Sequence, residues 1–155
     1  MVKDKGLEDR VLLPGAMKPE QVRQHMERAN VFLFTSDRNE GWGAVLNEAM
    51  NSGCAVAASH AIGSVPFLMR QKENGLIFRS GDWDDLYEKV KNLMSDPALR
   101  ERYGQAAYET IAGEWNADEA ARRFLCLAEA LAAGKDTPFA HGPCSRAEIL
   151  KDDWM

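Results

Sequence analysis

The chain has 155 residues, the length of a single domain, and 45% of them are hydrophobic, so a buried core can form. Its 19 Lys and Arg against 24 Asp and Glu give a net charge of −5, which disfavours binding to nucleic acid. The three cysteines are far apart in the sequence, which favours reduced thiols over a disulfide framework. Because no apolar stretch reaches membrane-spanning length and no signal-peptide pattern is visible, we expect a cytoplasmic globular domain.

Short apolar runs in the first half of the chain predict strands, at residues 11–13, 31–35, 55–58 and 75–78. None of them alternates apolar with polar residues, as is typical of strands buried on both faces of a parallel sheet. Helical spacing lies between them, at residues 19–29 and 43–52. This order predicts an α/β fold with a Rossmann-like, doubly wound parallel sheet of about four strands, flanked by helices.

The second half of the chain predicts helices. Asp82, Asp96 and either Asn116 or Asp118 can cap their first turns, and Gly134 ends the last one. One side of the first helix carries Leu86, Val90, Leu93 and Met94. In the last helix we expect five residues to face inward, namely Ala121, Phe124, Leu125, Ala128 and Leu131.

Residues 135–155 differ in composition from the rest of the chain. Pro138, Gly142 and Pro143 indicate a linker, and Ser145 predicts a short helix that ends at Leu150. We interpret this tail as a docking segment or as a mobile end.

The loop between the predicted strand 31–35 and the following helix is a candidate anion site. Ligands of open parallel sheets bind at the carboxyl ends of the strands, near helix N-termini. Gly41 and Gly43 allow the backbone to approach a ligand closely. A single Gly-x-Gly is a weak signal, and a plain glycine turn without a ligand is an equal alternative.

Two carboxylates strengthen the ligand interpretation. Glu40 and Glu48 have seven residues between them, so one lies in the loop and the other on the helix. Carboxylates accept hydrogen bonds from sugar hydroxyls, and a nucleotide sugar has a hexose on one side of its diphosphate and a ribose on the other. The alternative is that both residues are ordinary solvated charges.

These residues belong to a longer set of motifs. Residues 39–53 are NEGWGAVLNEAMNSG, preceded by VFLFTS at 31–36 and followed by IGSVP at 62–66 and NGLIF at 74–78. In this order they resemble the donor site of retaining glycosyltransferases with the GT-B fold, the "glycosyl transferases group 1" family. The resemblance extends over about residues 5–131.

The resemblance implies roles for individual residues. It places the transferred sugar at Glu40, the ribose at Glu48, and the diphosphate at backbone N–H groups of Gly41, Trp42, Gly43 and Ala44. It implies that residues 1–134 are a partial C-terminal, nucleotide-sugar-binding domain. The acceptor-binding N-terminal domain and the first strand of the donor domain would then be missing. Membrane association is expected only through that missing half.

The chain departs from the family pattern at several places. Phe67 stands where the family has a glutamate, and Trp42 where it has phenylalanine. We expect Trp42 either to stack on a sugar or base, or to pin the loop to the helix. The basic residues that neutralise the diphosphate are missing, and Arg38 and Arg10 are substitutes by charge alone.

Other side chains carry weaker signals. His60 follows the strand 55–58, so it either lines the crevice or is an ordinary loop histidine. Cys54 is expected to be a small buried residue. We find no metal-ligand spacing and expect neither a metal nor a cofactor, since the nucleotide sugar is a substrate.

The sequence therefore predicts the donor-binding half of a glycosyltransferase, inactive without its acceptor domain. Two alternatives stay open: a free-standing nucleotide- or anion-binding module, and a truncated remnant that needs a partner. The resemblance places the missing strand between the runs 11–13 and 31–35. Its absence would expose strand edges and favour self-association.

Overall fold

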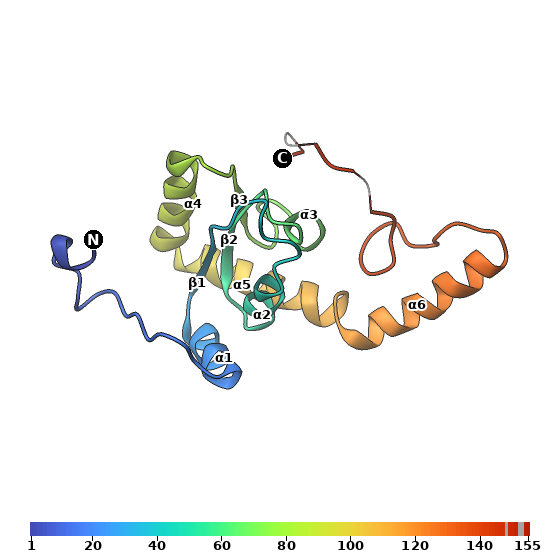
Figure 1. The fold of residues 1–155 in the computed structure, drawn as a ribbon, viewed down its shortest axis with the longest axis horizontal. Coiled ribbons are helices and arrows are strands. Elements are labelled where there is room, and N and C mark those ends of the chain that lie inside the picture. Colours follow the sequence, from blue (N-terminus) through green and yellow to red (C-terminus); the bar gives the residue numbers. More distant parts are fainter. Residues whose placement is uncertain (148, 152–153) are drawn as a thin grey trace.

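A parallel three-stranded sheet lies at the centre of the computed structural model, which describes residues 1–147, 149–151 and 154–155 (Figure 1). Its strand order is β1-β2-β3, with bounds Val31–Phe34, Ala55–Ser59 and Leu76–Phe78. Helix α2 (Val45–Asn51) connects β1 to β2, and α3 (Val65–Leu68) lies between β2 and β3. The predicted α/β class with helices flanking a parallel sheet is confirmed.

Strand β2 is buried along its whole length because helices cover both faces of the sheet. Successive strand residues point to opposite faces. Val56 and Ala58 accordingly belong to a core cluster with residues of α2 and α3, whereas Ala55 and Ala57 join a cluster with residues of α4 and α5. This double burial explains why the strand shows no polar alternation.

Helices α4, α5 and α6 begin at predicted caps. Helix α1 spans Pro19–Arg28, α4 Trp83–Ser95, α5 Pro97–Gly113 and α6 Ala117–Ala132, and a short 3-10 turn covers Lys3–Lys5. The side chains of Asp82, Asp96 and Asn116 each accept a hydrogen bond from the backbone N–H three residues on. The cap of α6 is therefore Asn116 and not Asp118.

The predicted strand at residues 11–13 is wrong, so the described part of the chain has three strands instead of about four. This segment is extended coil, and Leu13 is 80% exposed. A strand needs a hydrogen-bonded neighbour, and on its outer edge β1 pairs with no strand of the described residues. Leu33 in β1 is also exposed, on a face of the sheet.

The predicted inward face of α6 is also wrong. All five of its expected inward residues are exposed, and none of the residues of α6 is buried. Figure 1 shows the reason, since α6 (orange) leads away from the sheet and its apolar side has no layer of the domain to cover. In α4, Leu93 is buried as expected, but Met94 is exposed.

The tail returns to the domain at two points. Gly142 is buried beside the side chains of Glu114 and Arg123, and Trp154 packs against the core cluster near His60. The predicted helix from Ser145 to Leu150 includes residue 148, outside the described residues, and the described residues on either side of it are not helical. Among the described helices, none has both the length and the apolar character that crossing a membrane requires.

Gly104 provides a test of how α5 packs on the sheet. A Cβ at Gly104 would lie 2.2 Å from the Gly53 carbonyl oxygen, so we expect Gly104→Ala to lower the free energy of unfolding by about 2 kcal/mol. Gly113 is in the same helix and a Cβ there meets nothing within 4 Å, so Gly113→Ala should be neutral or stabilising by up to about 1 kcal/mol. Urea unfolding followed by circular dichroism measures both, and equal stabilities would contradict the close contact.

Candidate functional site

The loop from β1 to α2 is shaped by Gly43. Its φ is +76°, and a Cβ at this position would lie 2.8 Å from a ring carbon of Phe34 and 3.0 Å from Ile62. Since a residue in the left-handed region cannot continue an α-helix, α2 begins at Val45, two residues after the start of the predicted helix 43–52. With seven residues α2 is short, so the loop itself supplies most of the site.

A second loop holds the first in place. The N–H of Gly63 donates to the Gly41 carbonyl, and the N–H of Ser64 donates to the Trp42 carbonyl, both at 3.0 Å. A Cβ at Gly63 would lie 2.2 Å from the Gly41 oxygen, so only glycine allows this approach. The loops after β1 and β2 are therefore joined through their backbones, a connection that their separate sequence motifs did not predict.

The joined loop leaves a row of free hydrogen-bond donors. The backbone N–H groups of Gly41, Trp42, Gly43 and Ala44 donate to no backbone or side-chain acceptor in the described part of the chain. Successive unpaired N–H groups in a loop are a common way to bind an anion. The structure thus supports the predicted anion site, with the loop backbone as its main component.

The two predicted carboxylates flank these donors along the chain. Glu40 directly precedes them and is half-buried, while Glu48 lies on the first turn of α2 and is exposed. Neither carboxylate accepts a hydrogen bond from, or pairs with a cation of, the described residues. Both are therefore available to donors of a ligand.

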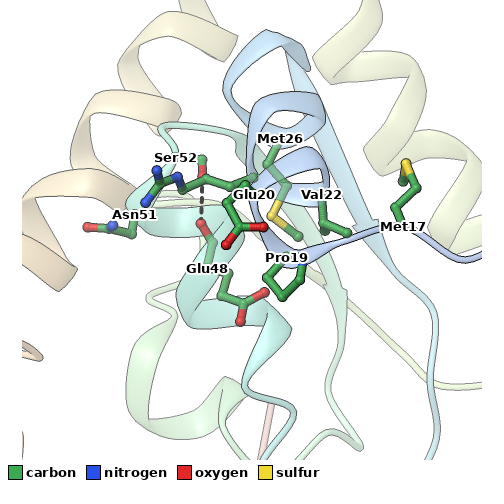
Figure 2. A pocket seen from close by; sticks show the side chains of 9 residues that line it. Met17, Pro19, Glu20, Val22, Met26, Glu48, Asn51 and Ser52 are labelled. Atoms are coloured by element: carbon green, nitrogen blue, oxygen red, sulfur yellow. Dashed lines mark hydrogen bonds between the residues drawn. The ribbon is translucent and has the colours of Figure 1, made fainter.

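Glu48 opens onto a cavity of about 550 Å³ between α1 and α2. Figure 2 shows its side chain extending from α2 toward Pro19 and Glu20 at the start of α1. Apolar side chains line the other part of the cavity, namely Met17, Pro19, Val22 and Met26. Sequence reasoning missed this cavity, because the spacing of Val22 and Met26 indicated only a packing face.

Trp42 is held by the protein. Its Nε1 donates to Asn47 Oδ1 at 3.0 Å, and its ring stacks on Phe67 with centroids 5.7 Å apart. A third ring, Trp115, lies at the same centroid distance. Of the two predicted roles, the structure supports pinning of the loop, and Phe67 is the stacking partner that does so.

His60 is placed more firmly than an ordinary loop histidine. It is only 7% exposed, and its Nδ1 accepts a hydrogen bond of 2.9 Å from the Ser80 N–H. It lines a cavity together with Arg38 and also with Arg79, which sequence reasoning did not single out. Arg10, by contrast, lies in the exposed segment before α1 (Figure 1).

Two titratable groups near these elements are perturbed. Burial raises the pKa of the Cys54 thiol, which fits its predicted role as a small core residue. Burial opposes ionisation of Asp85, but the Arg79 N–H that it accepts and the Lys89 ammonium together lower its pKa. Within the described residues, no group of three or more His, Cys, Asp and Glu side chains is arranged to hold a metal ion.

The parallel sheet, the helical second half and the donor loop at the carboxyl end of β1 define the C-terminal domain of a GT-B glycosyltransferase. The chain belongs to the family "Glycosyl transferases group 1", whose model matches residues 1–110.

Relatives in this family include a sulfoquinovosyl transferase of Arabidopsis thaliana, 33% identical over 66% of this chain and 21% of its own length. A lipopolysaccharide core mannosyltransferase of Rhizobium leguminosarum is 32% identical over 68% of this chain and 29% of its own length. The chain spans between 11% and 35% of the length of the curated relatives that it matches.

Solved structures show the same fold. The C-terminal domain of a group 1 glycosyltransferase from Francisella tularensis is 26% identical, with a TM-score of 0.68 over 75% of this chain and 59% of that one. Sucrose-phosphate synthase from Thermosynechococcus elongatus is 28% identical, with a TM-score of 0.71 over 86% of this chain and 33% of that one.

The connection between the two loops can be tested at its glycines. We expect Gly63→Ala to separate the loops, to shift the amide signals of residues 41–44 and to lower the free energy of unfolding by about 2 kcal/mol. Gly41→Ala is the matched control, because a Cβ there meets nothing within 4 Å and its φ is not positive. Amide NMR spectra and urea unfolding compare the variants, and an unperturbed loop in Gly63→Ala would refute the connection.

Proposed function

We propose that this chain is the donor-binding part of a retaining glycosyltransferase that transfers a sugar from a nucleotide-diphosphate sugar to a glycan, lipid or polysaccharide-precursor acceptor. The observation that carries the proposal is the row of free N–H groups at residues 41–44 with an unpartnered carboxylate on each side, Glu40 and Glu48. Donors for a diphosphate and acceptors for hydroxyls occur here in the order that a nucleotide sugar requires.

The nucleoside end of the donor fits the cavity at Glu48. Its volume of about 550 Å³ is within the range of small-molecule sites. Glu48 accepts hydrogen bonds from the ribose hydroxyls, and the apolar wall formed by Met17, Val22 and Met26 shelters the base. This arrangement holds the nucleoside diphosphate, which is the leaving group of the reaction, in place.

The diphosphate lies against the loop N–H groups. As the bond to the sugar breaks, the leaving diphosphate gains negative charge, and donors that are already oriented stabilise it without rearranging. The connection to Gly63 and Ser64 keeps the loop in this conformation before substrate arrives. These loop N–H groups therefore provide the electrostatic stabilisation of the leaving diphosphate in this domain.

Glu40 orients the transferred sugar through its hydroxyls. Neither Glu40 nor Glu48 is a general base, because both position the substrate and leave the reacting atoms to other groups. Acceptor recognition belongs to an N-terminal domain outside this chain, consistent with the short share of its relatives that the chain spans. We expect the chain by itself to bind donor without transferring sugar.

The relatives support this proposal. A structural neighbour, Anabaena HepE, has been solved with UDP and with UDP-glucose. Curated relatives act in lipopolysaccharide core and capsular polysaccharide biosynthesis. We therefore propose that the enzyme acts in the biosynthesis of a surface glycan.

Charge-neutral variants of the two carboxylates test the model. We expect Glu48→Gln to weaken binding of the nucleoside diphosphate and of the nucleotide sugar alike, by about tenfold, because it removes a charged acceptor for the ribose. Glu40→Gln should weaken only the nucleotide sugar, since the free nucleotide does not reach it. Titration of the labelled chain with UDP, GDP and ADP and their glucose conjugates, followed by amide chemical shifts, measures each affinity.

Glu73→Gln is the control, because Glu73 is exposed in the turn after α3, away from the loop. A site that binds nucleotide sugars but ignores Glu40 would instead indicate an anion-binding module. A well-folded chain whose residues 40–48 respond to none of the nucleotides would indicate a remnant that needs its partner domain.

A further inference from the structure

A separate cavity of about 380 Å³ lies at the carboxyl edge of the sheet. The loops that follow all three strands contribute to it: Arg38 comes after β1, His60 after β2, and Arg79 and Ser80 after β3. It shares no residue with the cavity at Glu48. The function proposed above leaves this cavity unused.

His60 supplies a hydrogen-bond donor to this cavity. Its Nδ1 accepts from the Ser80 N–H, so the neutral ring carries its proton on Nε2. Nε2 donates to no acceptor among the described residues, and although the residue is only 7% exposed, this atom is not one of their fully buried unpartnered atoms. The Nε2–H is therefore available to donate to a ligand oxygen in the cavity.

Arg79 supplies a positive charge to this cavity, and the Asp85 carboxylate interacts with it electrostatically without forming an ion pair. Asp85 accepts the backbone N–H of Arg79, and its carboxylate forms an ion pair with Lys89, both at 2.9 Å. Asp37, which also lines the cavity, accepts the N–H and the side-chain amide of Asn39 through the same oxygen. In the described part of the chain, the Arg79 guanidinium has no ion pair of its own.

We propose that this cavity is a subsite for an oxyanion carried by a sugar, a carboxylate or sulfonate, bound by the Arg79 guanidinium and the His60 Nε2–H. The planar guanidinium suits an oxyanion because it can donate two parallel hydrogen bonds. The subsite adjoins Asn39, the neighbour of Glu40, so it lies on the sugar side of the donor loop and not on the nucleoside side.

The proposal rests on the donor site proposed above, and it names the substrate class as an acidic sugar. The acid group belongs either to the transferred sugar or to the acceptor sugar. Pairs of ligands that differ only in a carboxylate distinguish the two sources: UDP-glucuronate against UDP-glucose, and methyl β-D-glucuronide against methyl β-D-glucoside with UDP present.

The experiment is an amide chemical-shift titration of the labelled chain with these four ligands. For an acidic donor we expect UDP-glucuronate to bind about tenfold more tightly than UDP-glucose, with shifts at residues 37–39, 60 and 79–80. For an acidic acceptor, methyl β-D-glucuronide should shift these signals in the presence of UDP, whereas methyl β-D-glucoside should not. Arg79→Gln should abolish the preference, whereas Arg28→Gln, an equal loss of charge at the exposed end of α1, should leave it unchanged.

If neither acidic ligand differs from its neutral counterpart at these residues, or if Arg79→Gln keeps the preference, the subsite is refuted. A failure of the donor site itself is recognised separately. In that case no nucleotide would shift residues 40–48, while the glucuronide arm still reports on the oxyanion subsite.

Discussion

The candidate site depends on two backbone hydrogen bonds, from the N–H groups of Gly63 and Ser64 to the carbonyls of Gly41 and Trp42. These bonds use two backbone carbonyls of the loop between β1 and α2 and leave the N–H groups of residues 41–44 free. Because a Cβ at Gly63 would collide with the Gly41 oxygen, the contact requires glycine. The same two bonds therefore join the loops after β1 and β2 and present the donors that suit an anion.

The parallel sheet explains why the polar groups of the candidate site lie at one edge. All three strands end there, so each following loop contributes polar groups to the same side of the domain. The loop after β1 carries the free N–H groups, and the loops after β2 and β3 bring His60 and Arg79 to the same edge. Burial of β2 between two apolar clusters fixes the relative positions of these loops.

Two surfaces of the domain are left uncovered by the described residues. On its outer side β1 has no neighbour among the described residues, and the apolar side of α6 is exposed. Both surfaces have the character of faces that another layer covers. Their exposure agrees with the small share of its relatives that this chain spans.

The sequence by itself determined the elements that depend on local chemistry. The N-caps Asp82 and Asp96, the buried strand β2 and the order of the loop motif at residues 39–53 follow from side chains that act on their own neighbours. Sequence periodicity also identified which faces of the helices are apolar. It could not say whether anything covers them.

Tertiary structure decided what depends on partners distant in the sequence. Residues 11–13 have the composition of a strand but lack a strand to pair with, and α6 has an apolar side without a layer beneath it. The contact between Gly41 and Gly63, the cavity at Glu48 and the placing of Arg79 beside His60 join residues about 20 or more positions apart. Spacing along the chain does not encode such contacts, because only the packed sheet brings its loops together.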